Sequence, residues 1–323
     1  MRILKCLLMA ASLLLTMQAH AAPDSYPDHP IQTIVPFAPG GNADITARLV
    51  TDALSRKLGQ PFIIENKGGA GGLVGGAVVA RAKPDGYTIM SGTGGPIFAS
   101  SVVAGDRAPY TLKDLVPIGR ISTVPLILAV NSKSPYSNFS QFASASKTHP
   151  GKISVGHAGQ ATTNQVSVLQ LQKALGTTFI IVPYKGSSPS VQDLIGGQID
   201  AVSAEATACL QYIQSGQLRA LAIIGEKRLA ALPQVPTMRE LGVRGVDVTT
   251  FAGMMAPAHT PKTIIDRLSH ALGEVVQDPA FDHRLEQLGG VPAYLPPTEF
   301  SAFLANEQQK YVHLVNEGLI EIK

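Results

Sequence analysis

Short apolar segments alternate with longer stretches in which apolar residues recur every three or four positions, along almost the whole chain. The short segments are typical of buried strands and the longer ones of amphipathic helices. Strands are predicted at 33–36, 62–65, 87–91, 117–121, 126–130, 153–156, 178–183, 201–204, 219–224 and 251–256. Helices are predicted at 43–58, 72–82, 138–147, 162–175, 189–196, 207–215, 262–277 and 298–317. This alternation predicts an α/β fold with mainly parallel sheets flanked by helices.

The first predicted strand ends in a proline- and glycine-containing turn at 37–44, and a helix begins directly behind it. The apolar positions of this helix recur on one face, at Ile45, Leu49, Ala53, Leu54 and Leu58. Asn42 or Asp44 can cap its start, and Gly59 stands where its end is expected. The free amides and the dipole at a helix start favour an anion, so this turn is predicted to bind one.

Four further turns follow predicted strands, at 68–72, 92–96, 156–164 and 184–188. Ligands in open α/β sheets bind at the carboxyl ends of strands, so these turns are predicted to face one cleft. The bare glycines of 68–72 let a backbone approach a ligand or another lobe closely. The hydroxyl and amide side chains of 156–164 suit helix caps and ligand hydrogen bonds alike.

Several candidates also have a purely structural interpretation. Asp44 is explained as well by a helix cap or dipole partner, and Thr162 and Thr163 by caps of their own helix. Lys185 is suited to a carboxylate but equally to solvent or to another loop. His157 fits a hydrogen-bonded turn residue as well as an acid–base group. What favours the binding interpretation is that such turns recur at strand ends facing one predicted cleft.

Two lobes are expected, without a Gly/Ser-rich linker between them. Extended strands are therefore predicted to cross between the lobes, near 126–130 and 245–251. These crossings divide the chain into a first lobe of 22–124 plus 250–323 and a second lobe of 125–249. The cleft between the lobes is the expected binding site.

Residues 1–21 read as a secretory signal, with Arg2 and Lys5 before an apolar core at 7–17 and a small-residue cleavage pattern at 19–21. Removing these two basic residues leaves 24 basic against 23 acidic ones, which gives no reason to expect nucleic acid or an anionic membrane as a partner. Cys209 is then the one remaining cysteine, so no internal disulfide is expected, and it is interpreted as packing. A periplasmic location fits an exported, disulfide-free chain.

The usual catalytic and cofactor motifs are absent from the sequence. It has no Gly-x-Ser-x-Gly, Walker or His-Glu-x-x-His pattern, and its eight histidines show no metal-ligand spacing. The glycine cluster at 68–76 fails as a dinucleotide turn because Val74 stands where the third glycine belongs. No cofactor, no metal and no enzyme activity are therefore predicted.

Ordered motifs along nearly the whole mature chain resemble the Bug-type receptors, the periplasmic solute-binding subunits of tripartite tricarboxylate transporters. The matching segments are Tyr26-Pro27, Pro30-Ile31, 34–44, Gly59-Gln60-Pro61, Glu65-Asn66, 69–72, 84–88, 150–152, 182–186, 193–198, 218–222, 232–237 and Ala256-Pro257. The resemblance implies a two-lobed, type II periplasmic-binding-protein fold that closes over a small carboxylate. It also implies that backbone amides and ordered waters at 37–44 hold the carboxylate, with the turn at 159–163 facing them.

Motifs and resemblance together give one set of candidate ligand-binding residues. They are Phe37, Pro39, Gly40, Gly41, Asn42, Asp44, Thr93, Gly94, His157, Gly159, Gln160, Ala161, Thr162, Thr163, Tyr184, Lys185, Gly186 and Glu205. This chain departs from the family pattern near 156–165, which is Gly-Ser-x-Gly-x-Gly-Ser followed further along by a His. His157, Ala161, Thr162 and Gln165 stand at the positions of the first Ser, a Gly, the second Ser and the His. Phe251 stands where Trp is common.

The expected function is capture of a small organic carboxylate, whether a dicarboxylate, tricarboxylate, amino acid or aromatic acid, and its delivery to a membrane permease by a monomeric receptor. If Glu205 faces the cleft, it favours a ligand bearing an amine or hydroxyl and repels a second carboxylate. Two alternatives remain, a receptor that signals to a membrane sensor kinase and an exported α/β enzyme that uses His157 with Glu205.

Overall fold

The computed structural model describes residues 26–246 and 248–320, so the signal peptide predicted at 1–21 lies outside the described residues. The strands are β1 (Ile31–Val35), β2 (Phe62–Asn66), β3 (Thr88–Gly92), β4 (Leu115–Asn131), β5 (Ser154–His157), β6 (Ile180–Pro183), β7 (Ala201–Glu205), β8 (Leu218–Ile224), β9 (Thr249–Pro257) and β10 (Val291–Leu295). The α-helices are α2 (Asn42–Leu58), α3 (Leu73–Ala80), α4 (Ser100–Ala104), α5 (Phe139–Thr148), α6 (Thr163–Leu175), α7 (Ser187–Ile195), α8 (Ala206–Gln214), α9 (Lys262–Val276), α10 (Pro279–Gln287) and α11 (Pro297–Asn316).

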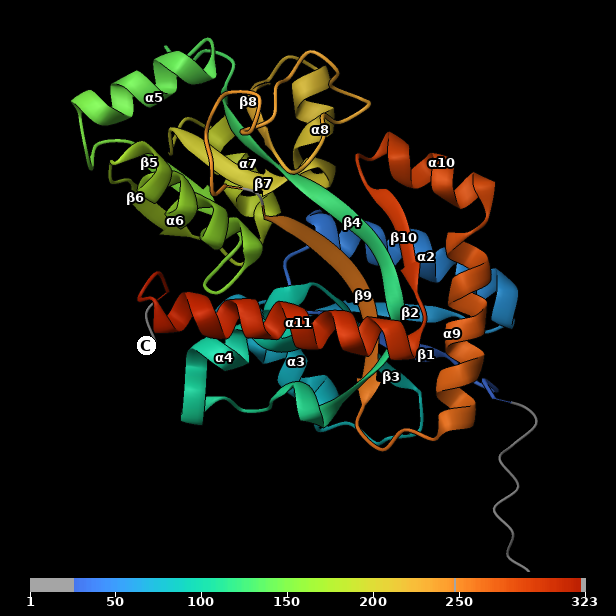
Figure 1. The fold of residues 1–323 in the computed structure, drawn as a ribbon. Helices are drawn as coiled ribbons and strands as arrows, with labels where there is room; N and C mark the ends of the chain where they lie inside the picture. Colours follow the sequence, from blue (N-terminus) through green and yellow to red (C-terminus); the bar gives the residue numbers. More distant parts are fainter. Residues whose placement is uncertain (1–25, 247, 321–323) are drawn as a thin grey trace, which may run out of the picture.

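One long strand, β4, passes through both halves of the molecule (Figure 1). Its first part, up to Pro125, pairs antiparallel with β9, and β10 lies on its other edge. From Leu126 onward β4 instead pairs with β7 and β8. The outer strands pair in parallel, β1 with β2 and β3 in one half and β5 with β6 and β7 in the other. The expected parallel pairing therefore holds for the outer strands, whereas the strands next to β4 make the two sheets mixed.

In the first lobe the sheet of β1, β2, β3, β9 and the first part of β4 is covered by helices on both faces. One apolar cluster joins this sheet to α2, α9 and α10, with Val50, Leu272 and Leu285 at its centre. A second cluster on the opposite face joins it to α3, α4 and α11, and contains Phe300. These residues are nearly inaccessible to solvent, so hydrophobic burial holds the three layers together.

In the second lobe the sheet of β5–β8 and the last part of β4 is likewise covered on both faces. The helices α7 and α8 pack on one face through Val191, Leu194 and Leu210. The helices α5 and α6 pack on the other through Phe142 and Leu171. Each lobe is thus a helix–sheet–helix sandwich, as the alternating sequence pattern predicted.

Four elements differ from the sequence prediction. The segments predicted as strands at 117–121 and 126–130 form the single strand β4, because the intervening polar and proline positions still pair, Pro125 with Thr249. The helix α10 was not predicted, since only Phe281 and Leu285 are buried and so short a stripe is a weak signal. The strand β10 was also not predicted, because it is a partly exposed edge strand containing Pro292. Gly95 and Pro96, read as a turn, instead begin a helical segment that continues into α4.

Within the described residues, no helix has the length and apolar character needed to cross a membrane.

Candidate functional site

The amino-terminal ends of α2, α6, α7 and α8 meet around one cavity between the two lobes. The cavity is lined by Phe37, Gly41, Asn42, Ala43, Thr93, Ala158, Thr162, Thr163, Asn164, Ser187, Glu205 and Thr250. Three of these helices, α2, α7 and α8, begin at Gly41, Gly186 and Glu205 without a side-chain cap. Helix starts carry unpaired amides and partial positive charge, so their convergence suits the cavity to a negatively charged group.

Asp44 holds the turn ahead of α2 in place. Its carboxylate accepts hydrogen bonds from Gly40 N, Asn66 Nδ2 and two nitrogens of Arg48, each at 2.9 Å. Burial alone disfavours the charged form, but the hydrogen bonds from Arg48, Gly40 and Asn66 outweigh it and hold the Asp44 pKa below its usual range. Both carboxylate oxygens are engaged, so Asp44 positions the turn rather than facing the cavity.

Unpaired donors lie at the start of α2. The backbone amides of Gly41, Asn42 and Ala43 have no acceptor among the described residues. The side chain of Asn42 is buried, and its Oδ1 accepts from Thr46 Oγ1 at 3.3 Å and from Thr207 Oγ1 at 3.1 Å. Its Nδ2 has no partner within the described part of the chain. Buried donors without partners are costly, and an anion in the cavity would satisfy them.

Across the cavity, the turn ahead of α6 is held by its own hydrogen bonds. Thr162 Oγ1 donates to Gly159 O at 2.6 Å and accepts from Gln165 N at 3.4 Å, so Thr162 caps α6 as well as lining the cavity. Ala161 has a left-handed φ of 59°, and its amide donates to Gln165 Oε1 at 2.7 Å. Gln165 therefore holds the backbone of this turn in its strained conformation.

His157 lies behind this turn and is closed off from solvent. Its Nδ1 accepts from Gly159 N at 3.2 Å and lies 2.9 Å from Gly159 O. Burial lowers the His157 pKa to about 4, although the hydrogen bond to Gly159 acts in the opposite direction. The imidazole is thus neutral near pH 7, and its contacts favour the interpretation of His157 as a structural turn residue.

Within the described part of the chain, Glu205 is the one ionisable side chain that lines the cavity. It ends β7 and precedes α8, and it is 5% exposed. Burial raises its pKa, while hydrogen bonds from Ser187 Oγ and from the Asn164 side chain partly offset that shift. The structure places Glu205 among the residues that line the cavity.

The two lobes touch directly beside the cavity. Ala38 N of the first lobe donates to Lys185 O of the second at 3.0 Å. A Cβ at Gly68 would lie 3.3 Å from both of those backbone groups, and a Cβ at Gly71 only 2.2 Å from Gln160 O. The bare glycines of the turn at 68–72 therefore permit close contact with the other lobe.

The structure brings some of the predicted residues together and leaves others outside. Those that line the cavity are Phe37, Gly41, Asn42, Thr93, Thr162, Thr163 and Glu205. Those that do not line it are Pro39, Gly40, Asp44, Gly94, His157, Gly159, Gln160, Ala161, Tyr184, Lys185 and Gly186.

The residues outside the lining have other contacts. Pro39, Gly40 and the Lys185 side chain are exposed, which fits the solvated interpretation of Lys185. Tyr184 donates from its hydroxyl to Asp193 Oδ2 at 2.7 Å, within the second lobe. Gly94 lies where a Cβ would meet Phe98 at 3.3 Å.

Sequence reasoning missed five residues of the lining, Ala43, Ala158, Asn164, Ser187 and Thr250. Ala43, Ala158, Asn164 and Ser187 belong to turns that were recognised, and reading every residue beside each helix start would have included them. Thr250 has no comparable signal, because it reaches the cavity only through the pairing of β9 with β4.

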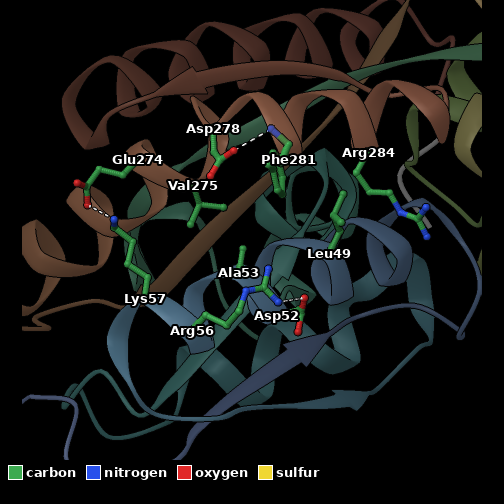
Figure 2. Close-up of a pocket in the computed structure, with 11 residues that line it drawn as sticks. Leu49, Asp52, Ala53, Arg56, Lys57, Glu274, Val275, Asp278, Phe281 and Arg284 are labelled. Atoms are coloured by element: carbon green, nitrogen blue, oxygen red, sulfur yellow. Dashed lines mark hydrogen bonds and ion pairs between the residues drawn. The ribbon is translucent and has the colours of Figure 1, made fainter.

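A larger groove of about 580 Å³ lies elsewhere, between α2, α9 and α10 (Figure 2). Its charged groups are largely satisfied within the protein: Lys57 pairs with Glu274 at 2.8 Å, Asp52 pairs with Arg56, and Asp278 accepts from Ala280 N at 2.8 Å. Mutually paired surface charges leave little net attraction for a ligand. The cavity at the helix starts is therefore the better candidate site.

Two lobes that share the strand β4, with a cavity between them at several helix starts, define the two-lobed fold of periplasmic binding proteins. The family model described as "Tripartite tricarboxylate transporter family receptor" matches residues 46–319, and the chain belongs to this family. The protein is a solute-binding receptor and not an enzyme, as the sequence predicted.

Individual relatives agree with this assignment. BugT of Bordetella pertussis is 34% identical over 306 residues, covering 94% of each chain. The solved structure of the periplasmic binding protein BugD is 34% identical, with a TM-score of 0.87 over 92% of this chain and 99% of that one. MatC of Rhodopseudomonas palustris, solved with bound malate, is 30% identical, with a TM-score of 0.83 over 90% of this chain and 100% of that one. The predicted resemblance to Bug-type receptors is confirmed.

Proposed function

We propose that this receptor captures a small organic carboxylate in the cavity at the helix starts and delivers it, in the periplasm, to a tripartite tricarboxylate transporter permease. The observation that carries the proposal is the set of unpaired donors at the start of α2, namely the amides of Gly41, Asn42 and Ala43 and the buried Asn42 Nδ2. Among the residues that the structure describes, no lysine or arginine lines this cavity, so the anion is held by neutral donors.

Neutral donors are sufficient for useful affinity. A hydrogen bond to a charged group contributes about 1.5–3 kcal/mol net. Three or four such bonds reach about 8 kcal/mol, which corresponds to a micromolar dissociation constant. Because the donors are already positioned by α2 and Asp44, little ordering is needed when the acid binds.

Binding requires the lobes to separate. The cavity has a volume of about 10 Å³, room for roughly one water molecule. Even a small acid needs more space, so we propose that it binds to an opened cleft that then closes over it. MatC binds malate, and another R. palustris relative, 26% identical with a TM-score of 0.84, was solved with adipate. These ligands support a small carboxylate as the solute class, and the balanced charge gives no reason to expect nucleic acid as a partner.

Thermal-shift measurements on the mature receptor test the proposal directly. Dicarboxylates, tricarboxylates, amino acids and aromatic acids are screened, and at least one acid is expected to raise the melting temperature through preferential binding to the folded state. If none of these acids shifts the melting temperature, the carboxylate-receptor proposal is rejected.

Substitution of Gly41 tests the proposed anion turn. Gly41 has a φ of −89°, which other residues adopt freely, and an added Cβ would lie 3.7 Å from Ser187 N and Ser188 N. Gly41→Ala is therefore expected to fold normally and to bind somewhat more weakly. The branched side chain of Gly41→Val extends further toward the start of α7, so ligand stabilisation should be lost while the fold remains. Unchanged affinity in Gly41→Val would exclude this turn as the anchor.

Delivery to a permease requires a test in the cell. Deleting the gene should abolish uptake of the radiolabelled acid identified in the screen. If uptake persists while transcription in response to that acid is lost, the receptor instead signals to a membrane sensor kinase.

A further inference from the structure

Glu205 places an acidic group inside a cavity whose other features attract an anion. Its side chain is 5% exposed, and Ser187 Oγ donates to its Oε2. The side chains that hydrogen-bond to it, Ser187 and Asn164, are uncharged, and Glu205 together with burial raises the pKa of the Cys209 thiol, which keeps that group neutral as well. Among the described residues, no lysine, arginine or histidine forms an ion pair with Glu205.

A buried carboxyl group without a cation partner is unfavourable as an anion. A ligand that donates a hydrogen bond or carries a positive charge removes this disadvantage when it binds. A ligand that presents a second carboxylate adds like-charge repulsion to it. Glu205 therefore favours a ligand whose far end donates a hydrogen bond or carries a positive charge over a ligand whose far end is a carboxylate.

The unpaired donors of Gly41, Asn42 and Ala43 at the start of α2 form the proposed anion anchor. This anchor and Glu205 lie close enough to contact one small molecule. Asn42 of the anchor accepts a hydrogen bond at 3.1 Å from Thr207, which lies in the first turn of α8 just after Glu205. Asn42, Ser187 and Glu205 all line the same cavity. The anchor belongs to the first lobe and Glu205 to the second, so a ligand with complementary ends would bridge the lobes and favour closure.

We infer that the solute is an acid with one carboxylate and a hydrogen-bond-donating group, foremost an ammonium, at its other end, and that Glu205 binds that group. This inference rests on the proposed carboxylate-binding function and specifies its substrate class. It distinguishes this receptor from MatC, which binds malate.

Calorimetry with length-matched ligands tests the inference. The ligands are short alkanoates, aminoalkanoates with the ammonium at each position, and dicarboxylates of corresponding length. In the unmodified receptor an aminoalkanoate should bind about tenfold or more tightly than the matched alkanoate, as one charge-assisted hydrogen bond predicts, and the dicarboxylate should bind most weakly. In Glu205→Gln the aminoalkanoate should weaken about tenfold while the dicarboxylate gains affinity. The matched control Glu274→Gln, in the groove of Figure 2, should leave the ranking unchanged.

The outcomes separate the inference from the proposed function. If alkanoates or dicarboxylates bind as tightly as the aminoalkanoates, the inference is overturned and carboxylate binding stands. If no acid of any class binds, both fail. The ranking in the unmodified receptor decides the matter even where Glu205→Gln does not fold, and melting curves show whether it does.

Discussion

At the residue scale, His157 shows how burial and one tight turn determine a protonation state. The sequence allowed both an acid–base role and a structural one. The structure surrounds the ring with the backbone of Gly159 and closes it off from solvent, which lowers the His157 pKa to about 4. This lowering of the pKa cannot be predicted from His157 and its sequence neighbours, because the burial that desolvates the ring arises from the packing of the second lobe.

This pKa predicts a defined pH dependence of stability. Between about pH 6.5 and pH 4 the unfolded chain binds a proton at His157 that the folded protein does not, so the free energy of unfolding falls as the pH is lowered through that range. The loss is about 3 kcal/mol by linkage. His157→Asn should lack this component, so urea denaturation at a series of pH values should show its stability falling less steeply than that of the unmodified protein. Equal slopes would mean that His157 protonates alike in both states.

The role of Asp44, like the pKa of His157, depends on contacts that its sequence neighbours do not show. Its place in the first turn of α2 suggested either a cap or a ligand contact. The structure engages both of its oxygens with Gly40, Arg48 and Asn66, and Asn66 comes from β2. The role of Asp44 as a support for the turn follows from this long-range contact, which sequence spacing does not reveal.

At the element scale, α2 was predicted well because its signals are local. It begins after Gly41 and ends at Gly59, which has a left-handed φ of 72°. The apolar face was predicted less well. Its centre lies on Ala47, Val50 and Leu54, whereas Leu49 and others of the predicted positions pack only at its margin. The face is decided by how α2 packs against α9 and the sheet.

The turn at 68–72 gives a prediction about contact between elements. Gly71 and Gly176 have nearly equal φ values of 62° and 64°, so alanine brings similar backbone strain at either position. Of these two positions, only at Gly71 would the new Cβ meet another backbone, Gln160 O at 2.2 Å, whereas no atom of the described residues lies within 4 Å of a Cβ at Gly176. Gly71→Ala should therefore hold the lobes further apart and weaken ligand binding, and Gly176→Ala should not.

Small-angle scattering and calorimetry check this prediction. With the best acid from the thermal-shift screen present, Gly71→Ala should show a larger radius of gyration than the Gly176→Ala control. Identical radii and affinities for the two variants would show that close approach at Gly71 is not needed for closure.

At the scale of the whole molecule, the two lobes are joined through β4 and β9 rather than through a flexible linker. The partner of β4 changes from β9 to β7 and β8 between Pro125 and Leu126, near the predicted lobe boundary at 124/125. The exact division into 22–124 plus 250–323 and 125–249 stays a prediction. Strands that continue from lobe to lobe suit a hinge, because bending a few residues moves each sandwich as a unit.

A disulfide across the cleft tests whether the lobes must separate. An added Cβ at Gly40 would lie 3.6 Å from Ser188 Cβ, within the range that a disulfide spans. In a Gly40→Cys, Ser188→Cys variant, oxidation without ligand should prevent acid binding, and reduction should restore it. The buried Cys209 should not interfere, because burial raises its pKa and so suppresses the reactive thiolate.

Calorimetry of the oxidised and reduced variant provides the measurement, with each single-cysteine variant as a control. If the oxidised protein binds the acid as fast and as tightly as the reduced one, the solute reaches the cavity without separation of the lobes at this contact.

The amino-acid sequence by itself determined the α/β class, most elements and the turns at which helices begin, because these depend on residues within a few positions of one another. Its motifs also indicated the family. Only the tertiary structure decided which residues share the cavity. Asn42 accepts a hydrogen bond from Thr207, which lies 165 positions away in the sequence, and the pairing of β9 with β4 places Thr250 at the cavity. Such long-range contacts depend on how the helices and sheets of each lobe pack and on how the two lobes are hinged, and no local sequence pattern encodes that arrangement.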